Sequence, residues 1–258
     1  MSNLHKSEKM NFGYKKLYIN GDLVDSKSGK KLEVICPANE ESIGSVAMAS
    51  VEDAKLALKS AKQGFLYWSK LSLVKRTEWI NKLKDAVILN ENKLRSAITY
   101  EMGKPYAGSY EDFEALVNAL DWYPNAMKNL KDEMIPDYEN THTHKLISQP
   151  AGVVVAYLAW NFPLLNVAFK LGPALAAGCS VIVKPDVITP GVVMELVDIC
   201  KECGVPPGVV NLLSGDPPSI AQQLIASDIV KKISITGSSR VGKLILKQAA
   251  DKVQRVTM

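Results

Sequence analysis

The second half of the chain alternates apolar segments with helical ones, and this repeat constrains the fold more than any other feature. Apolar segments begin near Gly152, Ser180, Val209 and Lys232. Their starts lie roughly 25 residues apart, which is typical of a strand followed by a crossover helix. Because these segments are apolar throughout instead of alternating, we expect strands that are buried on both faces. The pattern predicts an α/β protein with an open, Rossmann-like parallel sheet and helices on both faces.

The segments between the predicted strands supply the crossover helices, which we expect at residues 167–177, 191–203, 219–226 and 241–252. In open parallel sheets, ligands bind at the carboxyl ends of the strands. The candidate site therefore consists of the loops that follow the strands, at residues 159–166, 184–190, 214–219 and 236–242.

Residues 1–131 have a different pattern, in which short strands precede helices. Residues 14–50 contain short apolar segments separated by turn residues. The Asn20-Gly21 pair between two of these segments predicts a β-hairpin, because both residues readily adopt the backbone conformation of a two-residue turn.

The helices of this region have recognisable start and stop residues. A first helix is expected after Ser50, since Asp53 three residues on completes a capping-box-like pair. A second is expected over residues 74–101, with Gly103 ending it. A third is expected to begin near residue 107.

Residues 132–150 are polar, with alternation in Thr-His-Thr-His-Lys-Leu-Ile-Ser, and they predict an exposed ribbon. The edges of an exposed ribbon have unpaired backbone groups that can pair with another chain. We therefore expect this ribbon to mediate strand pairing with a second subunit, and the protein to be a homo-oligomer.

The composition excludes some classes of partner. With 31 Lys and Arg against 27 Asp and Glu, the net charge of +4 gives no reason to expect a nucleic acid. No apolar run reaches the roughly 18 residues that predict a membrane span, so no membrane partner is expected. The first residues lack the apolar core of a secretory signal. Because the four cysteines are few, we expect a reducing compartment and a cytoplasmic location.

Neither of two metal-like motifs is complete. Cys200 and Cys203 form a CxxC pair, but no second pair follows to complete a zinc site. His142 and His144 would lie on one face of a strand, but a third ligand is missing. We therefore predict no metal site.

Two of the strand-end loops have polar groups suited to a phosphate or a sugar. Gly237 and Ser238 follow a strand and open a helix, where backbone N–H groups attract an anion. An ordinary helix cap explains Ser238 equally well, and the GxGxxG fingerprint is absent. Lys184 ends a buried strand, and its ammonium either reaches a ribose or phosphate oxygen or extends to solvent at the rim.

Asn161 follows the first apolar strand and is surrounded in sequence by large apolar residues. We expect its amide to be buried and therefore hydrogen-bonded. An amide N–H here could donate to a developing oxyanion, or it could brace the loop. Its position alone favours the bracing role.

Three motifs occur in order and with matching gaps: AWNFPLLNVAFKLGPALAAGCSVIVKPDVITP, GVPPGVVNLLSG and ITGSSRVG. Together they resemble the NAD(P)-dependent aldehyde dehydrogenase family, whose patterns are PWNFP, a KPSE-type element before TP, GxPxGVxN and FTGSxxxG. EMGKP at residues 101–105 and YINGDLVDSKSGK near the start are also similar. The resemblance covers about residues 17–258.

In that family a Cys attacks the aldehyde, an Asn amide stabilises the oxyanion, a Glu activates water, and a hydride passes to the nicotinamide. The resemblance implies that Asn161 is the oxyanion Asn and that Lys170 supports it. It also implies that Lys184 hydrogen-bonds the adenine ribose. The implied cofactor is NAD or NADP, and its implied site comprises Tyr157, Leu158, Trp160, Lys184, Asp186, Val187, Gly215, Gly237, Ser238, Val241 and Gly242.

The sequence departs from the family pattern at several positions. Ala159 replaces the Pro before Trp160. Val187 stands where many NAD-preferring members have a Glu that binds the ribose, so NADP becomes admissible, although Asp186 opposes its 2′-phosphate. Pro217 stands where the family often has a Gly, and we expect weaker cofactor affinity as a result.

The resemblance implies that the chain ends before the family's base Glu and nucleophilic Cys, and none of the four cysteines matches that nucleophile. We expect residues 1–131 and 151–258 to form the cofactor-binding portion, residues 132–150 to form an oligomerisation ribbon, and the catalytic domain to be absent. Without a thiolate no covalent intermediate with the aldehyde substrate forms, so this chain alone is predicted to be inactive.

Two other functions stay open. The chain could belong to a relative that forms or reduces an acyl thioester or an acyl phosphate on the same fold. It could also be a non-catalytic pseudoenzyme or assembly fragment that pairs through residues 132–150. Stabilisation by a nucleotide would separate a binding protein from an inert one.

Overall fold

A seven-stranded sheet forms the centre of the computed structural model, which describes residues 10–215 and 218–258. Five of its strands are parallel, in the order β12-β11-β8-β9-β10. Their bounds are β8 (Val153–Tyr157), β9 (Ser180–Lys184), β10 (Val210–Leu212), β11 (Val230–Ile235) and β12 (Arg255–Thr257). The predicted α/β class and the four predicted strands are confirmed. The position of Pro217 lies outside the described residues.

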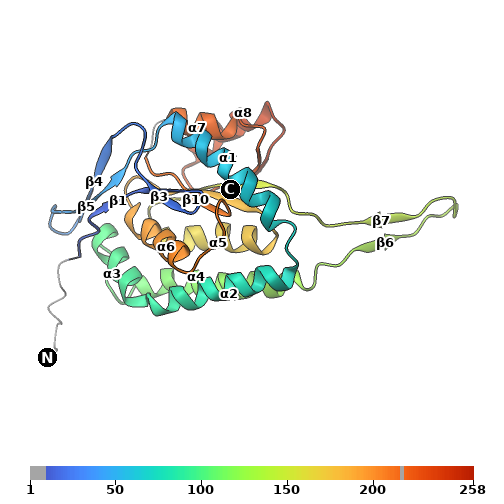
Figure 1. The fold of residues 1–258 in the computed structure, drawn as a ribbon, viewed down its shortest axis with the longest axis horizontal. Coiled ribbons are helices and arrows are strands. Elements are labelled where there is room, and N and C mark those ends of the chain that lie inside the picture. The colour runs from blue at the N-terminus through green and yellow to red at the C-terminus, as the bar shows by residue number, and fades with distance from the viewer. Residues whose placement is uncertain (1–9, 216–217) are drawn as a thin grey trace.

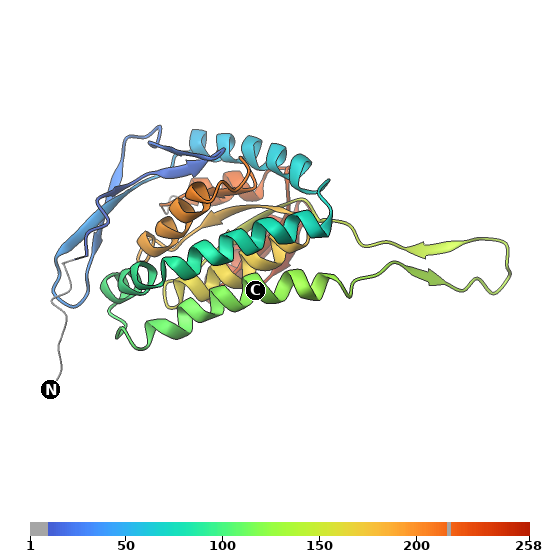
Figure 2. The ribbon, with the colours of Figure 1, turned by 60° about the horizontal axis from the view of Figure 1, so that its bottom comes forward.

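Helices cover both faces of the sheet (Figure 1). On one face lie α1 (Val51–Trp68), α7 (Pro218–Ile225) and α8 (Ser239–Ala250). On the other lie α5 (Pro163–Ala176) and α6 (Gly191–Glu202). Outside these two helices, α2 (Leu73–Leu89), α3 (Glu91–Met102) and α4 (Ser109–Met127) form a further layer, which packs on α5 and α6 (Figure 2). The four predicted crossover helices are present.

The two central strands are buried on both faces, as their uniform apolar character predicts. In β8, Val154 and Ala156 belong to the core under α5 and α6, whereas Val153 and Val155 belong to the core under α1, α7 and α8. Every residue of β8 and β9 is buried. The sheet therefore separates two apolar layers, and only its edges and strand ends reach solvent.

The predicted hairpin at Asn20-Gly21 joins β2 (Leu17–Ile19) to β3 (Asp22–Val24). Both turn residues have positive φ, 58° at Asn20 and 85° at Gly21, which is the geometry of a two-residue hairpin turn. The sequence did not predict that β2 pairs antiparallel with β10 and so extends the central sheet. A separate sheet has the order β1-β5-β4, from β1 (Tyr14–Lys15), β5 (Ser42–Ala47) and β4 (Lys31–Ile35).

The helical region differs from the prediction in one respect. Ser50 and Asp53 form the expected capping box of α1, and Gly103 ends α3 with φ 72°. The single helix expected over residues 74–101 is instead two helices, α2 and α3, which meet at Asn90. Asn90 leaves helical geometry, and its side chain donates to the Ala86 carbonyl, a local bond that competes with helix continuation.

Residues 132–150 form an exposed two-stranded ribbon that projects from the body (Figures 1 and 2). Its strands are β6 (Glu133–Ile135) and β7 (His144–Leu146), paired antiparallel. All six of their residues are exposed, as the polar alternation predicts. Within the described ranges, no helix is long and apolar enough to cross a membrane.

Two glycines allow α1 to cross the loop before β10 at backbone contact. A Cβ on Gly64 would lie 2.1 Å from the carbonyl carbon of Gly208, and Gly208 itself has φ +78°. Asn211 of β10 is fully buried beside this crossing. Its side chain accepts from the Ser60 hydroxyl at 2.8 Å and donates to the Gly208 carbonyl at 2.9 Å. The GVPPGVVN motif therefore joins β10 to α1.

We predict that Gly64→Ala destabilises the protein by about 3 kcal/mol or more, because the added methyl meets backbone atoms that cannot move independently. In an open helical position the same change would stabilise by about 1 kcal/mol. Chemical denaturation measures the change in stability, and Gln63→Ala, at the exposed preceding position of α1, is the control. A Gly64→Ala protein as stable as the wild type would contradict the crossing.

Candidate functional site

A cleft of about 540 Å³ opens at the carboxyl ends of β8, β9 and β11. The order of the sheet explains its position. β9 lies on one side of β8 and β11 on the other, so the loops that leave these strands diverge. The cleft is lined by residues 157–161, 184–187 and 235–238 and by Val241.

Most of the predicted site residues lie in this one cleft. Asn161, Lys184 and Gly237, from three different strand ends, all line it. Three of the loops that were expected to form the candidate site therefore meet at one cleft. The other predicted residues that line the cleft are Tyr157, Leu158, Trp160, Asp186, Val187, Ser238 and Val241.

Lys170 lies directly behind the cleft wall instead of lining it. Its Nζ donates to Thr236 Oγ1 at 2.6 Å and to the Asn166 carbonyl at 3.2 Å, and Thr236 does line the cleft. The side chain is only 6% exposed, and burial lowers the pKa of Lys170 to about 8. The sequence motif indicated Lys170, but nothing in it indicated Thr236 as the partner that connects this cation to the site.

The two remaining predicted glycines do not line the cleft. Gly215 has φ +102° and lies against Met48, whose Cε would be 3.3 Å from a Cβ at this position. Gly242 is buried in α8, where a Cβ would be 2.8 Å from Met258 Sδ. The positive φ of Gly215 favours glycine there, whereas Gly242 is close only to the end of the exposed Met258 side chain.

The expectation that Asn161 is buried is wrong. Asn161 is exposed, and no hydrogen bond to its side chain occurs among residues 10–215 and 218–258. The loop turns outward beyond the sheet edge, where Trp160 is also 51% exposed. The buried amide that braces this loop is Asn166, whose Nδ2 donates to the Ala159 carbonyl at 3.2 Å. The Asn161 amide therefore faces the cleft without a bracing role.

Ser238 is the N-cap of α8, and its hydroxyl accepts from the Val241 N–H at 3.3 Å. The helix-cap alternative is therefore correct for its side chain. Because α8 begins at the cleft, its first backbone N–H groups and the positive end of its dipole also lie there.

Backbone and hydroxyl contacts connect the cleft loops to one another. Thr189, 1% exposed, donates from Oγ1 to the Trp160 carbonyl at 3.1 Å. The Thr236 N–H donates to the Tyr157 carbonyl at 3.1 Å. Asp186 accepts from the Ile188 N–H at 3.0 Å, which fixes the turn after β9. These bonds hold the three walls in one arrangement before any ligand binds.

The metal-like motifs do not assemble a site in the described part of the chain, where no group of three ligating side chains occurs. His142 and His144 lie on the ribbon with their rings stacked, centroids 6.1 Å apart. All four cysteines are buried thiols, and none lines the cleft. Burial raises the pKa of both Cys200 and Cys203, which disfavours a reactive thiolate.

Comparison with known proteins is consistent with this architecture. The model of the aldehyde dehydrogenase family matches residues 23–258, and the chain belongs to that family. It is 34% identical over 240 residues to the mitochondrial succinate-semialdehyde dehydrogenase of Arabidopsis thaliana, covering 93% of this chain and 46% of the relative. It is 36% identical over 246 residues to a 3-succinoylsemialdehyde-pyridine dehydrogenase of a Pseudomonas species, covering 95% and 51%.

Solved structures give the same result. A betaine aldehyde dehydrogenase from Staphylococcus aureus in complex with NAD+ superposes with a TM-score of 0.90 at 30% identity, covering 94% of this chain and 48% of that one. An NADP-dependent enzyme from Escherichia coli superposes with a TM-score of 0.92 at 28% identity, covering 95% and 51%. The chain thus spans about half the length of these relatives.

We predict that Lys170 makes stability depend on pH between about 8 and 10.5. The folded state binds fewer protons than the unfolded state in that window, because burial lowers the pKa of Lys170 from 10.5 to about 8. Stability of the wild type should therefore rise with pH there, by up to about 3 kcal/mol, relative to Lys170→Met. Urea denaturation of both proteins across the window measures this. If the stabilities of the wild type and Lys170→Met change with pH in the same way, the lowered pKa of Lys170 is contradicted.

Proposed function

We propose that the chain binds a nicotinamide dinucleotide, NAD+ or NADP+, in the cleft, and that it forms the cofactor-binding portion of an enzyme that oxidises a small aldehyde to a carboxylic acid. The observation that carries this proposal is that three strand-end loops meet where the strand order reverses, with β9 on one side of β8 and β11 on the other. Ligands of such folds bind at this point of the sheet. Family membership and the relatives' nicotinamide-dependent chemistry support it.

The residues of the cleft fit such a ligand. Lys184 contributes a cation to the wall after β9, and the first N–H groups of α8 are suited to a pyrophosphate. The exposed Asn161 amide is suited to donate a hydrogen bond to an oxyanion that develops beside the nicotinamide. Lys170 would add positive charge one side chain behind Thr236. When bound, the nicotinamide supplies the hydride acceptor.

The choice between the two cofactors depends on the wall after β9. Val187 supplies no carboxylate to bind the ribose hydroxyls of NAD+, and so does not repel the 2′-phosphate of NADP+. The carboxylate of Asp186, which already holds the turn through the Ile188 N–H, opposes that phosphate. We propose that both cofactors bind, and that neither is strongly preferred.

Titration of the 258-residue chain with NAD+ and with NADP+ tests the proposal. We expect each nucleotide to raise the melting temperature, since it binds only the folded state. Lys184→Met should weaken binding about tenfold by removing a charge-assisted hydrogen bond, whereas exposed Lys62→Met should not. Absence of any shift at millimolar nucleotide would refute the proposal and favour a non-catalytic fragment.

We also propose that the chain by itself does not oxidise aldehydes, because the cleft contains no cysteine that could attack the carbonyl. Small aldehydes, including the semialdehydes for which several relatives are named, should give no reduced nicotinamide above the background. The absorbance of the reduced cofactor measures this. Turnover with any aldehyde that is abolished by Asn161→Ala would contradict it.

The ribbon of residues 132–150 is proposed to pair with another copy of the chain in a homo-oligomer. An isolated two-stranded hairpin is marginally stable in water, yet this one projects from the body (Figure 2). It also exposes large apolar side chains, with Met134 at 63%, Leu146 at 55% and Tyr138 at 98%. A partner that covers them would supply the missing burial.

A further inference from the structure

The corner between α3 and α4 carries two acidic side chains that reach the starts of α5 and α6. Neither of these two helices caps itself, because Phe162 and Pro190 occupy the capping positions and neither makes a side-chain cap bond. The first N–H groups of a helix have no partner within the helix, so buried starts need acceptors from elsewhere. The EMGKP motif, residues 101–105, lies at this corner.

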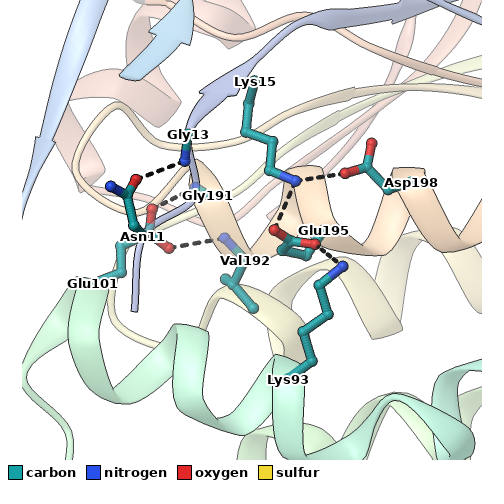
Figure 3. A network of polar contacts seen from close by, with 9 residues as sticks. All are labelled: Asn11, Gly13, Lys15, Lys93, Glu101, Gly191, Val192, Glu195 and Asp198. Carbon is teal, nitrogen blue, oxygen red and sulfur yellow. Dashed lines mark hydrogen bonds and ion pairs between the residues drawn. The ribbon is translucent and has the colours of Figure 1, made fainter. Parts of the chain in front are cut away.

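Glu101 supplies the acceptor for α6 (Figure 3). Its Oε1 accepts from the Gly191 N–H, and its Oε2 accepts from the Val192 N–H at 3.0 Å. The carboxyl is 1% exposed, and burial raises the pKa of Glu101 to about 8. Gly191 leaves no space at this contact, since a Cβ there would be 2.8 Å from Glu101 Oε1.

Asp112 performs the same role for α5. Its Oδ1 accepts from the Leu165 N–H at 2.6 Å, and the residue is fully buried. Lys104 of the same corner lies between this carboxylate and the cleft loop. Its Nζ is 3.6 Å from Asp112 Oδ2 and 3.5 Å from the ring centroid of Phe162.

Ion pairs hold α6 along its length as well (Figure 3). Glu195 of α6, itself buried, pairs with Lys15 of β1 at 2.7 Å and with Lys93 of α3 at 2.5 Å. Lys15 also pairs with Asp198 at 2.6 Å. These contacts restrict sliding of α6 along α3. The bond from Glu101 therefore fixes the position of the first turn of α6 relative to α3.

Both capped helices begin where a wall of the cleft ends. The loop of Trp160 and Asn161 leads directly into α5, and the loop of Asp186 and Val187 leads directly into α6. Thr189, two residues before Gly191, donates to the Trp160 carbonyl and so connects the two walls. The α3–α4 corner therefore contacts both walls through helix starts, without lining the cleft itself.

We propose that Glu101 and Asp112 are positioning residues, which set the separation of the two cleft walls by capping α6 and α5 from the α3–α4 corner. The expected effect of these two residues on nucleotide binding rests on the proposed function, whereas their expected effect on amide hydrogen exchange at the helix starts does not.

Amide hydrogen exchange and nucleotide titration test this in the full 258-residue chain. Without nucleotide, Glu101→Gln should speed exchange at residues 188–192, and Asp112→Asn at residues 163–166, because each leaves a buried N–H without a good acceptor. With NAD+ or NADP+, each variant should bind about tenfold more weakly than the wild type. Glu111→Gln, at an exposed residue of α4, is the matched control and should change neither result.

A role in stability alone would give a different pattern. Leu94→Ala removes a fully buried side chain from α3 and should lower the melting temperature without changing nucleotide affinity or exchange at the two helix starts. If Glu101→Gln does not fold, Thr189→Val replaces it, since it removes the Trp160 bond alone, and Thr189→Ser should restore affinity.

The outcomes separate the two proposals. Local exchange that speeds up at the helix starts supports positioning even if the wild type binds no nucleotide, a result that would overturn only the proposed function. Wild-type binding with unchanged affinity and unchanged local exchange in Glu101→Gln and Asp112→Asn would overturn positioning. Positioning is also overturned if Leu94→Ala weakens binding as much as they do, or if Thr189→Val binds as the wild type does.

Discussion

The burial of β8 on both faces is the constraint from which the rest of the structure follows. A strand with no solvent-facing side must have its backbone groups paired on both edges, and β8 pairs with β9 on one and β11 on the other. Both pairings are parallel, so the chain crosses over through helices each time, and all carboxyl ends lie at one edge. The cleft is the consequence, because the loops from β8, β9 and β11 leave that edge in different directions.

The sequence predicted the parts of the fold that depend on local pattern. The apolar strands, their crossover helices, the Asn20-Gly21 hairpin and the capping box at Ser50 each have a signal within a few residues. The break between α2 and α3 was missed because the apolar stripe continues across Asn90, and only the local bond of its side chain interrupts the helix. The pairing of β2 with β10 was missed because a three-residue strand does not specify its neighbour.

In the site, too, the sequence predicted some features and missed others. Motif order predicted which loops meet, since their residues follow strands that must share an edge. Burial and partners could not be predicted in this way. Asn161 was expected to be buried because its sequence neighbours are apolar, yet its loop leaves the core and Asn166 provides the brace. The contact of Lys170 with Thr236 joins residues 66 apart, and the contact of Glu101 with the start of α6 joins residues 90 apart, separations that no local pattern encodes.

We propose that the cleft formed by the ends of β8, β9 and β11 binds one nucleotide. Amide hydrogen exchange of the chain with and without saturating NAD+ or NADP+ tests it most directly. The account predicts slower exchange at residues 157–161, 184–187 and 235–241 together. Slower exchange confined to another hollow, such as the one between the β2–β3 hairpin and α1, would contradict it.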